Sequence, residues 1–178
     1  LGGLTVLKEI NRYLPSEDTV YFGDTARVPY GQRSKETIMK YTFQAINFLS
    51  TKDVKAIVIA CNTATARALA EAQEKYDIPI MGVIEAGAKS AVEYTKNKLV
   101  GVIGTAATIN SNAYNKAIED MDSSVKVIGR ACPLFVPLVE EGWANKDISS
   151  TAAQMYLDEL VDQGIDSLVL GCTHYPIL

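Results

Sequence analysis

Short aliphatic runs alternate with amphipathic segments along the chain. Apolar positions three or four residues apart predict helices over 4–14, 65–76, 85–95, 111–121 and 150–164, and one after the N-cap Ser34 that carries Ile38, Tyr41, Ala45, Phe48 and Leu49. Continuous apolar runs predict strands over 19–24, 54–60, 78–84, 98–104, 125–129 and 167–171. Strands without polar alternation are typical of a parallel sheet covered by helices on both faces. The pattern therefore predicts an α/β fold of three layers.

Composition narrows the class of protein. The 178 residues are 48% hydrophobic and 21% charged, with a net charge of −4 and no long block of Lys and Arg. This balance argues against a nucleic acid or an anionic membrane as the main partner. No apolar run approaches the roughly 18 residues that cross a bilayer, and no signal peptide opens the chain. Three widely spaced cysteines do not form a disulfide framework, so we expect a cytoplasmic protein.

The ends and the middle of the chain suggest how it is divided. It begins without Met and stops just after a predicted strand, so we expect a fragment trimmed at both ends. One series of strands and helices ends near residues 83–93, where another begins. We therefore expect two domains, over 1–84 and 85–178.

Four loops that follow predicted strands concentrate hydroxyl, small and reactive residues. They cover 23–31, 60–65, 104–111 and 171–176. Loops at the carboxyl ends of parallel strands lie along one rim and can converge on one crevice. Neutral polar groups and helix N-termini suit a small ligand with a carboxylate, and the loops supply Asn62, Thr63, Thr105, Thr108 and Thr173.

Cys61 and Cys172 each end a strand just before a polar turn, and this repeated arrangement needs an explanation. Either could be a small apolar core residue, which is common for free cysteine. A zinc site that adds Cys132 and His174 is a weaker alternative, because the chain has no C-x-x-C pair. Two thiols on opposite faces of one carbon would suit stereochemical inversion through a planar carbanion. The helix that begins after Cys61 would favour its thiolate.

Other candidates are less specific. His174 is the only histidine and lies two residues after Cys172, so it could lower the pKa of that thiol or assist proton transfer. Asp24 could assist on the opposite side or only cap a turn. Glu140 and Glu141 could orient His174 or belong to a solvated helix end. The sequence contains no dinucleotide or P-loop motif and no lysine in a setting typical of a pyridoxal Schiff base.

Five motifs in order give a specific resemblance: "GGLTVLKEI", "VYFGDTARVPYG", "ACNTATA", "ACPLFVPLVEEG" and "GCTHYPIL". Together they closely resemble bacterial glutamate racemases, of the cofactor-independent aspartate/glutamate racemase superfamily. The resemblance implies two pseudo-symmetric α/β domains, L- and D-glutamate as substrates, a role in peptidoglycan synthesis, and no pyridoxal phosphate or metal. It also implies a homodimer, and contact with DNA gyrase as in some relatives.

The resemblance also assigns residues. Cys61 and Cys172 fall on the acid/base pair, and the assisting groups fall on Asp24, His174 and Glu140, with Glu141 the less certain choice. Substrate contacts fall on Pro29, Tyr30, Gly31, Asn62, Thr63 and Thr173, with Thr105 and Thr108 as neighbours. The family's Asp-Ser-Gly motif would precede "GG" and is absent, so we expect the isolated 178-residue chain to be weak or inactive. The alternatives are an aspartate racemase or another two-cysteine racemase, and a non-catalytic binding protein on the same scaffold.

Overall fold

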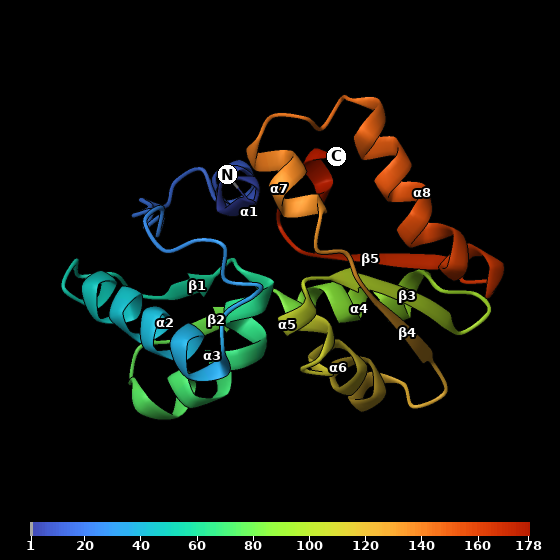
Figure 1. The fold of residues 1–178 in the computed structure, drawn as a ribbon. Helices are drawn as coiled ribbons and strands as arrows, with labels where there is room; N and C mark the ends of the chain where they lie inside the picture. The colour runs from blue at the N-terminus through green and yellow to red at the C-terminus, as the bar shows by residue number, and fades with distance from the viewer. Residues whose placement is uncertain (1) are drawn as a thin grey trace.

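A computed structural model describes residues 2–178, which form helices and two small parallel sheets (Figure 1). The strands are β1 (Ile57–Ile59), β2 (Ile80–Gly82), β3 (Leu99–Gly104), β4 (Lys126–Ala131) and β5 (Ser167–Gly171). The helices are α1 (Gly2–Tyr13), α2 (Lys35–Ser50), α3 (Asn62–Lys75), α4 (Ile84–Tyr94), α5 (Ala106–Ile109), α6 (Ala113–Met121), α7 (Phe135–Glu140), α8 (Asp147–Asp162) and the 3₁₀ helix η1 (Tyr175–Ile177). Within residues 2–178 no helix is long and apolar enough to cross a bilayer.

The second sheet has the order β4-β3-β5, and all its pairs are parallel. Its central strand β3 packs on both faces, because successive side chains point in opposite directions. Val100 and Val102 pack with α4 and α6, whereas Ile103 packs with α7 and α8. This part of the molecule is the three-layer α/β arrangement that the apolar runs predicted.

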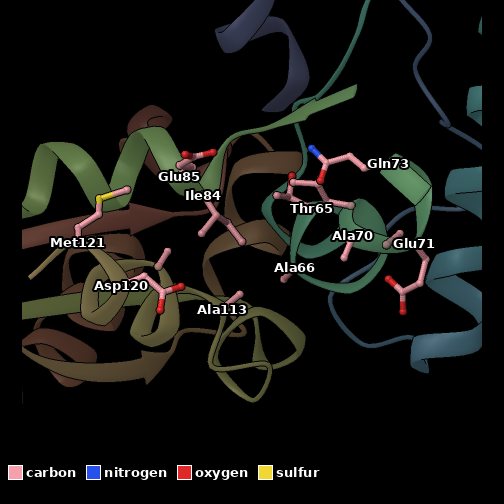
Figure 2. A pocket seen from close by; sticks show the side chains of 13 residues that line it. Thr65, Ala66, Ala70, Glu71, Gln73, Ile84, Glu85, Ala113, Asp120 and Met121 are labelled. Carbon is pink, nitrogen blue, oxygen red and sulfur yellow. The ribbon is translucent and has the colours of Figure 1, made fainter. Parts of the chain in front are cut away.

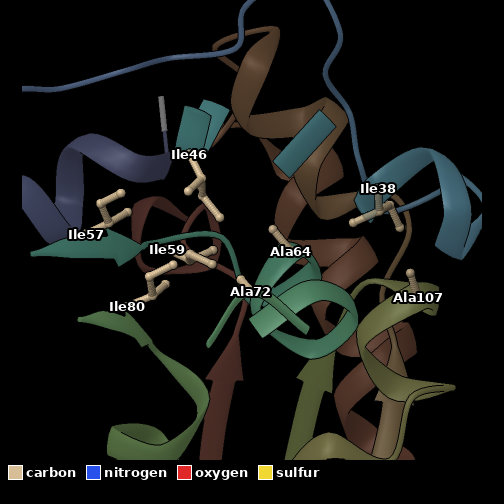
Figure 3. Packing of buried hydrophobic residues seen from close by; sticks show 8 residues of the cluster. All are labelled: Ile38, Ile46, Ile57, Ile59, Ala64, Ala72, Ile80 and Ala107. Carbon is tan, nitrogen blue, oxygen red and sulfur yellow. The ribbon is translucent and has the colours of Figure 1, made fainter. Parts of the chain in front are cut away.

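The first sheet pairs only β1 with β2, again in parallel. Its buried core joins α2 and α3 to one face of the sheet through isoleucines and alanines, shown in Figure 3. Val58 and Met81 point the other way and are exposed. In the part of the chain that the structure describes, this second face of β1 and β2 is therefore covered less completely than the first.

The boundaries of several elements differ from those predicted. Residues 19–24 are neither helix nor strand, and no described strand is paired with them. Helix α3 begins at Asn62, earlier than expected, so that Asn62 and Thr63 lie in its first turn. Ser34 caps α2 as predicted, and its hydroxyl accepts from the backbone N–H of Thr37. The two sheets lie on either side of residue 84, and the domain boundary there stays a prediction.

Replacement of Ile118 by Ala tests the core between α6 and β3. This side chain is 0% exposed, so the substitution leaves a cavity and should lower the free energy of unfolding by about 2–5 kcal/mol. Met155→Ala is the control, because Met155 is 73% exposed and its loss should change stability by less than about 0.5 kcal/mol. Chemical denaturation followed by circular dichroism gives both values. Equal losses in the two variants would contradict the assigned core.

Candidate functional site

The two cysteines come from the carboxyl ends of strands in different sheets. Cys61 follows β1 and is the N-cap of α3, with extended backbone angles (φ −78°, ψ 121°). Cys172 follows β5 and is buried. The thiols are near enough that a charge on Cys61 raises the pKa of Cys172. Two segments that are distant in sequence thus place their sulfur atoms in one electrostatic environment.

The pKa of the Cys61 thiol is raised above its ordinary value. Burial is the main cause, and it outweighs hydrogen bonds from the backbone N–H groups of Ala64 and Thr63 and from the Thr63 hydroxyl, which lower the pKa. The expectation that the start of the helix would favour the thiolate is therefore wrong in its net direction. The helix N–H groups act as expected, but the loss of water around the sulfur costs more.

Cys172 belongs to a chain of three polar side chains. Its Sγ lies 3.8 Å from Nδ1 of His174, and Nε2 of His174 lies 2.6 Å from Oε1 of Glu140. Favourable interactions, among them the bond from His174, outweigh burial and lower the pKa of Glu140. Because an ionised carboxylate only accepts hydrogen bonds, Nε2–H of His174 donates to Glu140, and Nδ1 faces the Cys172 thiol. Of the two glutamates considered, Glu140 makes this contact.

Burial raises the pKa of Cys172 to about 12. The charge of Cys61 adds to this rise, while the backbone N–H groups of His174 and Tyr175 oppose it. His174 thus lowers the pKa of Cys172 as expected, through its backbone N–H group. Burial raises this pKa by more, so the net shift is upward. Burial therefore opposes ionisation of both thiols.

Three threonine hydroxyls form a cluster between the start of α3 and the start of α5. Thr63 Oγ1 lies 2.8 Å from Thr105 Oγ1 and 3.3 Å from Thr108 Oγ1, and the last two are 3.1 Å apart. Thr105 is also the N-cap of α5, where its hydroxyl accepts from the backbone N–H of Thr108. The second and third predicted loops therefore meet directly.

The first predicted loop is held by Asp24. Its carboxylate accepts from Tyr30 Oη and, at 2.7 Å, from Nε of Arg27. Tyr30 packs against the same core as Cys61, and burial, followed by the bond to Asp24, raises its pKa. The carbonyl of Gly31 accepts from the backbone N–H of Ala107 at 3.4 Å, which joins this loop to α5. Pro29, next to Tyr30, is exposed.

One cavity of about 520 Å³ reaches part of the predicted site. It is lined by Asn62, Cys172 and Thr173, together with Tyr114 and polar and apolar residues mainly of α1, α4 and β5. The other residues assigned by resemblance do not line this cavity: Asp24, Pro29, Tyr30, Gly31, Cys61, Thr63, Thr105, Thr108, Glu140 and His174. The structure places them in the neighbouring contacts described above.

A second groove of about 410 Å³ lies between α3, α4 and α6 (Figure 2). Alanines line it together with three carboxylates, from Glu71, Glu85 and Asp120, and Glu71 pairs with Lys35 at 3.0 Å. Neither cysteine lines this groove, and no basic side chain does. Its negative charge disfavours an anionic ligand, so the cysteine loops are the better candidate for one.

Sequence reasoning missed three residues that contact the site. Thr5 donates its hydroxyl to the carbonyl of Thr173 at 3.4 Å, and a Cβ on Gly2 would overlap the side chains of Thr173 and His174. Tyr114 donates to the carboxamide oxygen of Asn62 at 2.7 Å. The "GG" in the first motif could have pointed to Gly2. Thr5 and Tyr114 have the spacing of ordinary amphipathic helices, and nothing in the sequence distinguishes them.

Cys132 packs in the same buried core as Cys172, but none of the described site residues hydrogen-bonds to its thiol. It is fully buried, and its Sγ–H contacts the carbonyl of Arg130 at 3.8 Å. Within residues 2–178 no three side chains of His, Cys, Asp or Glu come together in a way that could hold a metal ion. The alternative four-ligand zinc set is therefore not assembled in this part of the chain.

Two cysteines at the ends of parallel strands in an α/β fold are the features to compare with known protein families. The sequence matches the Asp/Glu/Hydantoin racemase family over residues 2–178. It is 55% identical to a glutamate racemase of Geobacter metallireducens over 178 residues, which is all of this chain and 66% of the relative. The chain belongs to the Asp/Glu/Hydantoin racemase family.

Solved structures agree with this assignment. Glutamate racemase isoform RacE1 of Bacillus anthracis matches with a TM-score of 0.96 and 45% identity, over 99% of this chain and 66% of that one. The glutamate racemase of Francisella tularensis, solved in complex with D-glutamate, matches with a TM-score of 0.92 and 46% identity over the same shares. The chain thus spans about two thirds of the length of these relatives.

The raised pKa values predict how the thiols react with iodoacetamide. A raised pKa in the folded state keeps the thiol form until higher pH, so alkylation of Cys61 and Cys172 should begin at higher pH than in the urea-unfolded chain. The unfolded midpoint should lie near pH 8.5, and the native midpoint of Cys172 at least about one unit higher. Mass spectrometry of alkylated peptides across pH gives both midpoints. A native midpoint below pH 8.5 would contradict the burial argument.

Proposed function

We propose that the protein containing this chain interconverts L- and D-glutamate, with Cys61 and Cys172 as the two acid/base groups. The observation that carries the proposal is that the two cysteine loops meet: Asn62, which follows Cys61, accepts a hydrogen bond from Tyr114, whose ring lies against Gly171, the residue before Cys172. Membership of the racemase family and the glutamate racemases among its relatives support the choice of substrate. The peptidoglycan role follows from the resemblance to bacterial glutamate racemases.

The proposed reaction removes one proton from one face of the α-carbon and adds a different proton to the opposite face. A thiolate removes the α-proton, so that the C–H bond breaks, an S–H bond forms and the electron pair stays on the substrate as a planar carbanion. The opposite thiol then gives its proton to the other face of the α-carbon. One enantiomer becomes the other, and the charge passes from one sulfur to the other.

The raised thiol pKa values set a condition for this chemistry. One sulfur must lose its proton before it can act as a base, and burial opposes that loss in the ligand-free site. The α-ammonium group of a bound amino acid lowers the pKa of a thiol beside it, whereas its carboxylates raise the pKa of a thiol near them. Substrate binding therefore activates the base only if the ammonium group lies nearer the sulfur than the carboxylates do.

The remaining residues take supporting roles in the proposal. His174, held by Glu140, assists proton transfer at Cys172, and Asp24 acts near Cys61 through its contact with Tyr30. Substrate contacts come from the first turn of α3 and from the other three loops, and the proposed set is Pro29, Tyr30, Gly31, Asn62, Thr63, Thr105, Thr108 and Thr173.

The decisive experiment uses the full-length protein in D₂O. Cys61→Ser and Cys172→Ser should each slow α-proton abstraction by about 10²- to 10⁴-fold, mainly from opposite enantiomers, because a serine hydroxyl is a far weaker acid/base than a thiol. NMR of deuterium entry at the α-carbon, starting from each pure enantiomer, measures this rate.

Cys132→Ser is the matched control, since Cys132 packs in the same buried core as Cys172 but follows β4 and is not one of the proposed acid/base pair. It should keep proton exchange close to the wild-type rate. Unimpaired α-proton exchange from both enantiomers in Cys61→Ser and in Cys172→Ser would contradict the two-base mechanism.

Two rival functions have their own tests. An aspartate racemase, or another two-cysteine racemase, would show faster turnover of L- or D-aspartate than of glutamate by the wild-type protein. A non-catalytic binding protein would bind glutamate without exchange of its α-proton. The homodimer, the contact with DNA gyrase and the cytoplasmic location rest on the resemblance and composition, and each remains a separate prediction.

A further inference from the structure

Tyr114 links the two cysteine loops from a third element, the helix α6. Its hydroxyl donates to Oδ1 of Asn62 at 2.7 Å, and Asn62 directly follows Cys61. Its ring lies against Gly171, the residue before Cys172. Tyr114 and Asn62 are 4% and 6% exposed, so their hydrogen bond is shielded from water. One side chain therefore contacts the neighbours of both thiols.

Two glycines leave the space that Tyr114 occupies. A Cβ on Gly87, in α4, would lie 3.0 Å from the Tyr114 hydroxyl, and a Cβ on Gly171 would lie 3.1 Å from Cε2 of the ring. Glycine inside a helix costs about 1 kcal/mol relative to alanine. A side chain at position 87 would crowd the Tyr114 hydroxyl, which explains a glycine there. The ring is held from two sides, which fixes where its hydroxyl points.

This hydrogen bond settles the orientation of the Asn62 carboxamide. Because Tyr114 donates to Oδ1, the amide nitrogen Nδ2 must point the other way, with its two N–H donors. Among residues 2–178 no buried side-chain nitrogen or oxygen lacks a partner, and Nδ2 makes no hydrogen bond there. Nδ2 therefore reaches open space, and the space that Asn62 lines is the cavity beside Cys172.

We propose that Tyr114 is a positioning residue, which holds the Asn62 carboxamide so that its N–H groups donate to an oxygen of the bound amino acid. The inference rests on the proposed racemase function and adds a residue to it. Without the phenol, the carboxamide could rotate, and its oxygen would then repel the substrate oxygen that its nitrogen should bind. Tyr114 acts through Asn62 and does not touch the reacting atoms.

The test is Tyr114→Phe in the full-length protein, which removes the hydroxyl and keeps the ring. KM should rise about 5- to 10-fold for both L- and D-glutamate, as expected for one weakened hydrogen bond. The value of kcat should change less than about twofold, because the thiols and their neighbours remain. An equal fall of kcat and kcat/KM with KM unchanged would contradict a role in substrate positioning.

Tyr76→Phe is the matched control. Tyr76 also donates to an asparagine carboxamide at 2.7 Å, that of Asn47, but the pair lies outside the cysteine loops. KM should stay at the wild-type value in this variant. The double variant Tyr114→Phe/Asn62→Ala should have the KM of Asn62→Ala alone, because nothing remains for the phenol to orient. Additive effects would overturn the proposal.

A measurement without substrate separates this inference from the proposed function. The two side-chain NH₂ signals of Asn62 in ¹⁵N NMR should shift in Tyr114→Phe relative to the full-length wild type, because the carboxamide loses its partner and begins to rotate about its Cβ–Cγ bond. Unchanged signals would overturn the positioning role whatever the activity. If the wild type fails to racemise glutamate while these signals change as expected, the proposed function is wrong, but Tyr114 still orients the Asn62 carboxamide.

Discussion

The structure depends on a buried polar contact between the start of α3 and the helices that follow β3. Thr63 meets Thr105 and Thr108 through hydroxyl groups, and Asn62 meets Tyr114 beside them. A buried polar group without a partner costs about 1–3 kcal/mol, so these residues favour one arrangement of the two halves. Both cysteine loops adjoin this contact, and their relative placement follows from it.

Burial serves the site in two opposing ways. It brings the thiols together in an environment of low polarity, where charges act strongly on one another, and it raises the pKa of both. The helix N–H groups at Cys61 and the backbone N–H groups at Cys172 offset only part of this cost. Either thiol therefore needs a further favourable interaction before it can act as a base. The acidic groove on α3, α4 and α6 has the opposite electrostatic character (Figure 2).

The sequence predicted most elements because buried strands and amphipathic helices carry their own periodicity. It failed at residues 19–24, since an apolar run shows that a strand is possible and not that a neighbour is present. It placed Cys61 and Cys172 at strand ends, but the direction of their pKa shifts depends on burial that no local pattern records. Tyr114 went unnoticed because it stands four residues before Ile118, the spacing of an ordinary core face.

The central claim is that two thiols act on opposite faces of one carbon. A crystal structure of the full-length protein with D-glutamate tests it most directly. We expect the sulfur atoms of Cys61 and Cys172 to lie on opposite sides of the α-carbon. We also expect Nδ2 of Asn62 to lie within hydrogen-bond distance of a substrate oxygen. D-Glutamate with both sulfur atoms on the same side of its α-carbon, or seated in the acidic groove, would contradict the account.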